Sequence, residues 1–163
     1  MAHGHAPSPG NGRTLVAVFF SPVAGYLLHF GRDAGFRAIL VEPDPGRADA
    51  ARASGLSPEA GVPASLDDSA DVVVTDHHRP ELGEMLRDAL ASPARWVGIM
   101  GNPRHPGPHV EALAALGVSE ADVARVHRPI GLNIGSRTPA EIAISTLAGL
   151  IADRNGRPGG FSF

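Results

Sequence analysis

The fold class of this 163-residue chain is decided by the stretch Thr14-Leu15-Val16-Ala17-Val18-Phe19-Phe20, which runs directly into Ser21-Pro22. The run is short, largely apolar and rich in strand formers, which is typical of a strand buried on both faces. Ser21 and Pro22 supply an N-cap and a first-turn proline, so a helix is expected from here to about residue 34. Gly35 is expected to end that helix, where a positive φ is usual.

The same alternation continues along the chain. Further strands are predicted over 36–41, 71–75, 95–100 and 125–127, with helices near 50–52, 80–90 and 109–116 and a loop over 54–69. Strands that alternate with helices imply a parallel sheet. We therefore predict an α/β, three-layer, Rossmann-like fold with a doubly wound, mainly parallel sheet. It forms one domain over 13–155, between flexible tails at 1–12 and 156–163.

The last helix has the clearest start signal. Thr138 stands at the N-cap, Pro139 in the first turn and Glu141 three residues after the threonine. This is the pattern of a capping box, in which each side chain satisfies the other's free backbone donor. The helix is expected to be buried through its apolar residues, Ile142, Ile144, Leu147, Leu150 and Ile151.

Composition excludes several kinds of chemistry. The chain has no Cys, and all 14 basic residues are Arg, which removes disulfides, thiolate sites, cysteine nucleophiles and lysine chemistry. The net charge of −3 gives no electrostatic footprint for nucleic acid. No apolar run approaches the roughly 20 residues that span a bilayer. We therefore expect no nucleic-acid or membrane partner, and the lack of Cys fits a cytoplasmic location.

Ligands of such sheets bind beyond the carboxyl ends of the strands, so the loops there hold the candidate residues. The first loop lacks the three glycines of a dinucleotide-binding turn. Ser21 and the helix N-terminus still offer donors, and Glu42 stands where a ribose-binding acid would, which leaves NAD(P) binding open. The alternative is that Ser21 is only a cap and Glu42 a surface acid.

Two imidazoles and a carboxylate follow the 71–75 strand in Thr75-Asp76-His77-His78. Asp76, His77 and His78 could bind Zn or Mn. The segment also resembles the signature of the DHH phosphoesterases, in which Glu42 and Asp44 would have to supply the further carboxylates. The alternative is an exposed, hydrogen-bonded loop.

Two later loops hold glycines beside polar groups. After the 95–100 strand, glycine allows a ligand to approach the backbone closely. Asn and Arg in the same loop can bind a phosphate or the polar edge of a ring. The residues concerned are Gly98, Gly101, Asn102 and Arg104. Before the last helix, backbone donors could form an anion-binding nest in the loop that holds Gly131, Asn133, Gly135 and Thr138. The alternative is a chain reversal with Ile130 and Ile134 in the core.

Five motifs, taken in their order and spacing, resemble those of one family. They are Thr75-Asp76-His77, Val97-Gly98-Ile99-Met100-Gly101, Gly117-Val118-Ser119-Glu120, Pro129-Ile130-Gly131-Leu132-Asn133-Ile134-Gly135 and Thr138-Pro139-x-Glu141-Ile142-Ala143. The family is the C-terminal Rossmann domain of the xanthine dehydrogenase accessory proteins (XdhC/CoxI). The resemblance covers about 14–155. Family members usually have Gly-x-Gly-His after the first strand, Gly-Ser-Arg-Arg after the fourth and Leu-Asp-Ile at Asn133, where this chain differs.

The resemblance implies a cytoplasmic maturation factor that binds molybdenum cofactor and assists assembly of a xanthine dehydrogenase-type molybdenum hydroxylase. It favours a binding or chaperone protein over an enzyme, a question that the residues leave open. Arg104 and the 131–138 loop would hold the anionic end, with Asp76 and His77 facing the pterin ring. Expected partners are the molybdoenzyme, a cysteine desulfurase or a separate polypeptide with the family's N-terminal part, and a second copy of the chain.

Overall fold

The computed structural model describes residues 10–163, which hold five strands and six helices. The strands are β1 (Thr14–Val18), β2 (Arg37–Val41), β3 (Ala70–Val74), β4 (Trp96–Ile99) and β5 (Val126–His127). The helices are α1 (Pro22–Asp33), α2 (Pro45–Ala53), α3 (Leu82–Ala91), α4 (Pro108–Ala115), α5 (Glu120–Val123) and α6 (Pro139–Arg154). The predicted tail over 1–12 lies mostly outside the described residues.

All five strands are parallel and lie in the order β2-β1-β3-β4-β5. The chain goes from β1 to one side for β2 and crosses to the other side for β3. The carboxyl ends of β1 and β3 therefore mark a topological switch point, where ligands of open α/β sheets bind. The predicted Rossmann-like parallel sheet is confirmed.

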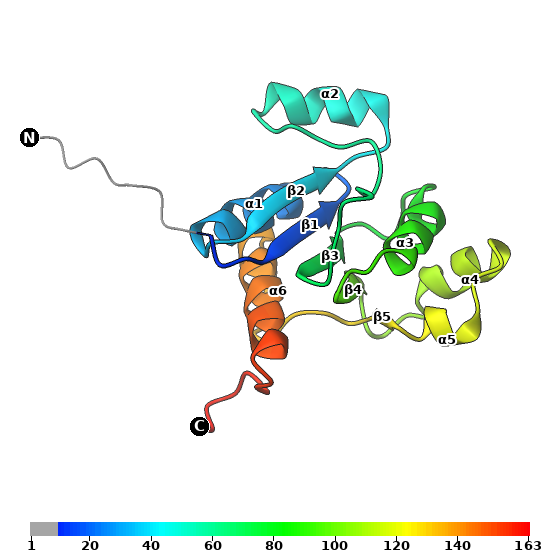
Figure 1. Cartoon of the computed structure of the whole chain (residues 1–163). Coiled ribbons are helices and arrows are strands. Elements are labelled where there is room, and N and C mark those ends of the chain that lie inside the picture. Colours follow the sequence, from blue (N-terminus) through cyan, green and yellow to red (C-terminus); the bar gives the residue numbers. More distant parts are fainter. Residues whose placement is uncertain (1–9) are drawn as a thin grey trace, which may run out of the picture.

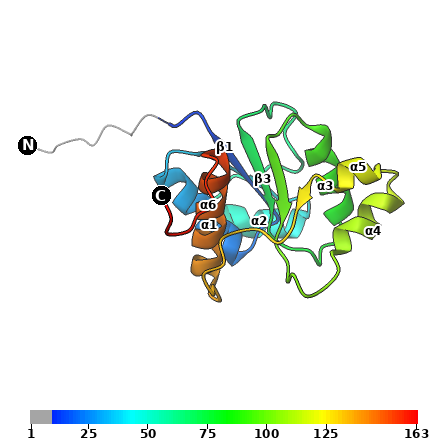
Figure 2. The ribbon, with the colours of Figure 1, turned by 90° about the horizontal axis from the view of Figure 1, so that it is seen from below.

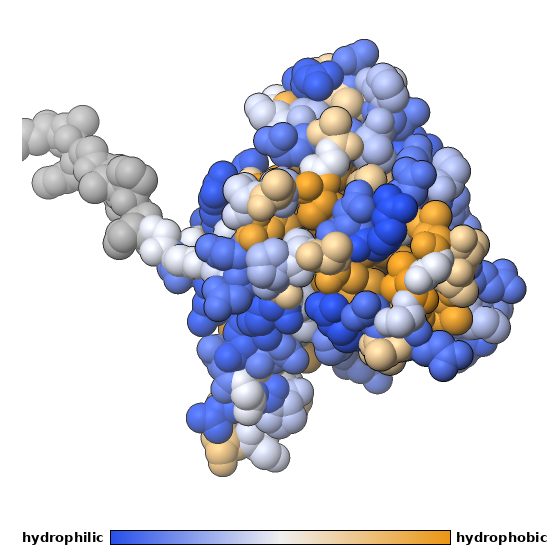
Figure 3. All heavy atoms as spheres, turned by 45° about the vertical axis from the view of Figure 1, so that its right-hand side comes forward, coloured by the Kyte–Doolittle hydropathy of each residue, from blue (hydrophilic) through white to orange (hydrophobic). Residues whose placement is uncertain are grey.

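The helices cover both faces of the sheet. Helices α1 and α6 lie side by side on one face, and α3, α4 and α5 lie on the other (Figures 1 and 2). Successive strand residues supply the two cores, because Val16 and Val18 pack toward α3 whereas Leu15 and Ala17 pack toward α1 and α6. Hydrophilic residues predominate at the top of the molecule, where α2 lies, and hydrophobic residues gather near the centre of the face seen in Figure 3.

Local signals set the ends of the two helices beside the site. Helix α1 is capped by Ser21, whose hydroxyl accepts from the N–H of Ala24, and it ends before Gly35 at φ +92°. Helix α6 begins with the predicted capping box between Thr138 and Glu141. Both predictions are confirmed.

One predicted core residue is wrong. Ile144 is 50% exposed, whereas Ala143, Leu147 and Leu150 are buried. The positions 143, 147 and 150 lie on one helix face, and 144 is turned about 100° away from 143. Apolar residues all around this helix hid the face that packs on the sheet. Ile142 and Ile151 are partly buried.

No helix among residues 10–163 is long and apolar enough to cross a membrane.

Candidate functional site

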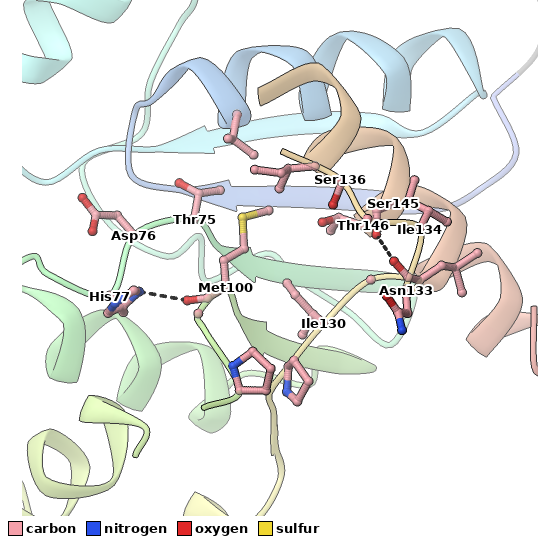
Figure 4. A pocket seen from close by; sticks show the side chains of 18 of the residues that line it. Thr75, Asp76, His77, Met100, Ile130, Asn133, Ile134, Ser136, Ser145 and Thr146 are labelled. Carbon is pink, nitrogen blue, oxygen red and sulfur yellow. Dashed lines mark hydrogen bonds between the residues drawn. The ribbon is translucent and has the colours of Figure 1, made fainter. Parts of the chain in front are cut away.

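A pocket of about 820 Å³ lies at the carboxyl edge of the sheet. Its walls come from the loops after β3, β4 and β5, from the first turn of α1 and from the first two turns of α6 (Figure 4). This size lies within the usual range for cofactor sites, about 300–1,000 Å³. The loops that sequence reasoning singled out after β3, β4 and β5 therefore meet in one hollow. The predicted residues that line it are Asp76, His77, Gly101, Arg104, Gly131, Asn133 and Gly135.

One end of the pocket is formed by the loop after β3. His77 points its Nδ1 at the carbonyl of Met100, 3.2 Å away. The carbonyl can only accept, so Nδ1 donates this hydrogen bond. Asp76 closes the loop by accepting the N–H of His78 at 2.8 Å through Oδ1. Thr75 ties this loop to β1 through its hydroxyl, which donates to the carbonyls of Val18 and Phe19.

The opposite end is formed by the loop before α6 and by that helix. Asn133 and Ile134 lie there with Ser145 and Thr146, and Met100 and Ile130 lie between the two ends (Figure 4). The Ser145 hydroxyl donates to the carbonyl of Leu132 at 2.6 Å and so holds the loop on the helix. Thr146 is 2% exposed and lines the pocket floor.

The β4–α4 loop supplies the positive charge of the pocket. Among the described residues that line the pocket, Arg104 carries the only permanent positive charge and Asp76 the only carboxylate. Arg104 is exposed, and its N–H donates to Asn102 Oδ1 at 2.9 Å. Asn102 itself does not line the pocket. The pocket thus has apolar walls, hydrogen-bonding groups at both ends and one cationic side chain, Arg104, at its rim.

The loop after β1 departs from a dinucleotide-binding turn. Phe19 is buried and takes φ +77°, a conformation that glycine adopts readily and a phenylalanine does not. The hydroxyl of Ser21 accepts from Ala24 and lies 3.3 Å from the Thr75 hydroxyl, outside the pocket lining. Pro22 has no N–H, so few donors remain at the start of α1.

Glu42 faces inward and is 1% exposed. Arg79 donates to both carboxylate oxygens of Glu42, from Nη1 to Oε1 at 2.9 Å and from Nη2 to Oε2 at 2.7 Å. The backbone N–H groups of Phe20 and Asp44 also donate to this carboxylate. Burial raises the pKa of this carboxyl, but the bonds from Arg79 and the two amides outweigh burial and hold its pKa below the ordinary value. The structure thus places Glu42 apart from the pocket.

The remaining predicted residues lie near the pocket and serve its framework. Gly98 lies inside β4, where an added Cβ would come within 2.2 Å of the Trp96 ring. Thr138 caps α6 and accepts the N–H of Glu141 at 3.2 Å. Gly131, which does line the pocket, has φ +87° and leaves room for the Ser145 hydroxyl.

The alternative metal set is only partly assembled. Asp76 and His77 line the pocket, whereas His78 does not. Residues 10–163 contain no group of three or more His, Asp or Glu side chains arranged to hold a metal ion. Glu42, one of the carboxylates that a phosphoesterase would need, is engaged by Arg79.

Sequence reasoning missed the residues of the pocket floor. Ser145 and Thr146 interrupt the apolar run of α6 over 142–151, and that interruption was the available signal. Met100, the first residue after β4, was also missed. Ile134 is 54% exposed and lines the pocket, so the alternative that placed it in the core is wrong.

Comparisons with known proteins agree with this architecture. The family model described as the XdhC Rossmann domain matches residues 15–150. The uncharacterized protein YqeB of Escherichia coli is 40% identical over 77 residues, which are 47% of this chain and 14% of YqeB. A crystal structure described as a xanthine dehydrogenase from Bacillus halodurans shares the fold, with TM-score 0.67 and 22% identity over 88% of this chain and 45% of that one. The chain thus spans less than half of either protein.

Proposed function

The chain belongs to the XdhC Rossmann-domain family, and from this premise we propose that it is an accessory factor that binds an anionic pterin. The ligand would be molybdenum cofactor or a related molecule, and the function would be to assist assembly of a xanthine dehydrogenase-type molybdenum hydroxylase. The observation that carries the proposal is the meeting of the loops after β3, β4 and β5 in one pocket.

The residues present fit such a ligand. A pterin is a flat ring with donors and acceptors along its edge, and the cofactor adds a phosphate. Met100 and Ile130 offer apolar surface between the two polar ends. Asp76 and Asn133 can bond the ring edge, and Arg104 can bind phosphate through two parallel hydrogen bonds.

In this proposal the chain binds and orients its ligand and performs no bond-breaking. The bound cofactor would supply the molybdenum chemistry of the recipient enzyme. His77 faces the ring in this proposal, and Arg104 with the 131–136 backbone holds the anionic end. Partners would be the molybdoenzyme, a cysteine desulfurase or a polypeptide with the family's N-terminal part, and a second copy of the chain. We propose a cytoplasmic location on the same premise.

The two alternatives find less support in the geometry. NAD(P) binding would use Glu42 on the ribose, but both of its carboxylate oxygens are bonded within the protein. A phosphoesterase would need a larger ligand set than Asp76 and His77 provide. Metal analysis separates that reading, because two tightly held Mn or Zn ions per chain would contradict an accessory factor without turnover.

The binding test uses 6-hydroxymethylpterin phosphate, whose own fluorescence reports occupancy. We expect saturable binding that Arg104→Ala weakens roughly ten- to a hundredfold, because a hydrogen bond to a charged group contributes about 1.5–3 kcal/mol. Arg137→Ala is the matched control, since Arg137 is exposed nearby but does not line the pocket. Lack of binding by the unaltered chain, or equal losses in both variants, would contradict the proposal.

A further inference from the structure

Arg128 joins the two loops that form most of the pocket, although it does not line the pocket itself. It follows β5 directly and precedes the loop that carries Asn133. Its Nη1 donates to the carbonyl of His105 and its Nη2 to the carbonyl of Asn102, each at 2.8 Å. Both carbonyls belong to the β4–α4 loop, so one guanidinium spans the turn that carries Arg104.

Asn102 is the centre of that turn. Its side-chain oxygen accepts the N–H of Arg104 at 2.9 Å, and its carbonyl accepts the N–H of His105 at 3.2 Å. The same carbonyl accepts from Arg128. The direction in which the turn presents Arg104 therefore depends on a carbonyl that Arg128 holds from outside the pocket.

Packing around the guanidinium is close. A Cβ at Gly101 would lie 2.6 Å from Arg128 Nε, and one at Gly107 would lie 2.4 Å from His109 Nδ1. His109 is 8% exposed, and both its Nδ1 and the Nε of Arg128 are buried without a hydrogen-bond partner. Glycine at 101 thus lets the guanidinium of Arg128 reach the loop, and glycine at 107 leaves room for the His109 ring.

We propose that Arg128 is a positioning residue that fixes the β4–α4 loop and, through Asn102, sets Arg104 at the rim of the ligand pocket. The ligand in this statement rests on the proposed function. The effect on the loop does not, because the contacts exist within the chain.

Hydrogen exchange of the chain without ligand tests the loop directly. The amides of Arg104 and His105 donate within the turn, so their exchange reports its order. In Arg128→Ala we expect amides over 101–107 to exchange at least tenfold faster, while those of α6 keep their rates. Arg128→Lys should give intermediate rates, since an ammonium lacks the planar fork that reaches two carbonyls.

Two controls accompany the exchange measurement. Arg125→Ala removes a neighbouring arginine that donates to the carbonyl of Leu90, outside the loop, and should leave 101–107 unchanged. Gly101→Ala disturbs the same contact from the loop, because the new methyl group would displace the guanidinium of Arg128. It should raise the exchange rates over 101–107 as Arg128→Ala does. Unchanged exchange over 101–107 in Arg128→Ala would overturn the proposal.

Binding of 6-hydroxymethylpterin phosphate supplies a second readout. Arg128→Ala should lower affinity, and Arg104→Ala should lower it without faster exchange in the loop. If Arg128 acts through Arg104, the double variant should bind about as weakly as Arg104→Ala alone. Additive losses would make Arg128 a direct ligand contact and overturn the positioning role. If the unaltered chain does not bind, the proposed function fails and the exchange result still decides the role of Arg128.

Discussion

Arg79 and Glu42 form a two-bond ion pair inside the protein, with side chains 5% and 0% exposed. The guanidinium also lies over the ring of Phe19, with its carbon 4.4 Å from the ring centroid. Glu42 directly follows β2, so the pair lies at the carboxyl end of the sheet. Neither side chain lines the pocket.

Breaking this pair should be costly. Arg79→Leu leaves the buried Glu42 without its countercharge, and Glu42→Gln leaves the buried Arg79 with only Glu81, whose Oε2 lies 3.3 Å from Nε. Each variant should lower the free energy of unfolding in urea denaturation, Arg79→Leu by about 3–5 kcal/mol and Glu42→Gln by somewhat less. Arg87→Ala is the control, because the side chains of its pair with Asp88 are each 44% exposed and the pair should contribute about 0–1 kcal/mol. Equal losses in the buried and exposed variants would contradict this view of the pair.

Phe19 allows a direct measurement of backbone strain. Its φ of +77° favours glycine, so Phe19→Gly and Phe19→Ala should differ even though both lose the buried ring. We expect both to be destabilised, with the glycine variant about 1–2 kcal/mol more stable than the alanine variant. Thermal or urea unfolding gives the difference, and an alanine variant as stable as glycine would show that the position is unstrained.

The packed face of α6 can be tested with two large apolar residues. Leu147→Ala should cost about 2–5 kcal/mol because Leu147 is 8% exposed. Ile144→Ala should change stability by no more than about 0.5 kcal/mol, since the side chain is half exposed. The reverse order in chemical denaturation would mean that the helix is rotated about its axis.

His109 should make stability depend on pH. Burial, together with the nearby charge of Arg128, lowers the pKa of this imidazole in the folded chain. Below the ordinary value of 6.5 the unfolded chain therefore binds a proton more readily, and unfolding becomes easier as the pH falls. From pH 7 to 5 we expect His109→Leu to lose less stability than the unaltered chain. Parallel pH profiles of unfolding free energy would rule out this role.

The alternation of strands and helices was readable from the sequence because it rests on local signals. Ser21 and Thr138 cap helices through groups within three residues, and the apolar strands need no distant partner to be recognised. The carboxyl-edge rule then placed Asp76, Arg104 and Asn133 in neighbouring loops. The structure brings those three residues to one pocket.

The sequence could not show which side chains form hydrogen bonds and ion pairs with residues far away in the chain. Glu42 finds Arg79 at a separation of 37 residues, and Arg128 finds Asn102 at 26. No local pattern indicates which arginine meets a given carboxylate or carbonyl. The exposure of Ile144 could not be predicted for a different reason. Apolar residues occur on all sides of α6, so the sequence does not indicate which side of the helix packs on the sheet.

We propose above that the pocket at the carboxyl edge holds an anionic pterin cofactor. Native mass spectrometry of the chain, purified from a host that makes molybdenum cofactor, tests this most directly, since it reports ligand mass and oligomeric state together. We predict one molybdopterin-containing ligand per chain, lost in Arg104→Ala and retained in Arg137→Ala. A bare chain from that host, or a chain that carries two Mn or Zn ions instead, would contradict the claim.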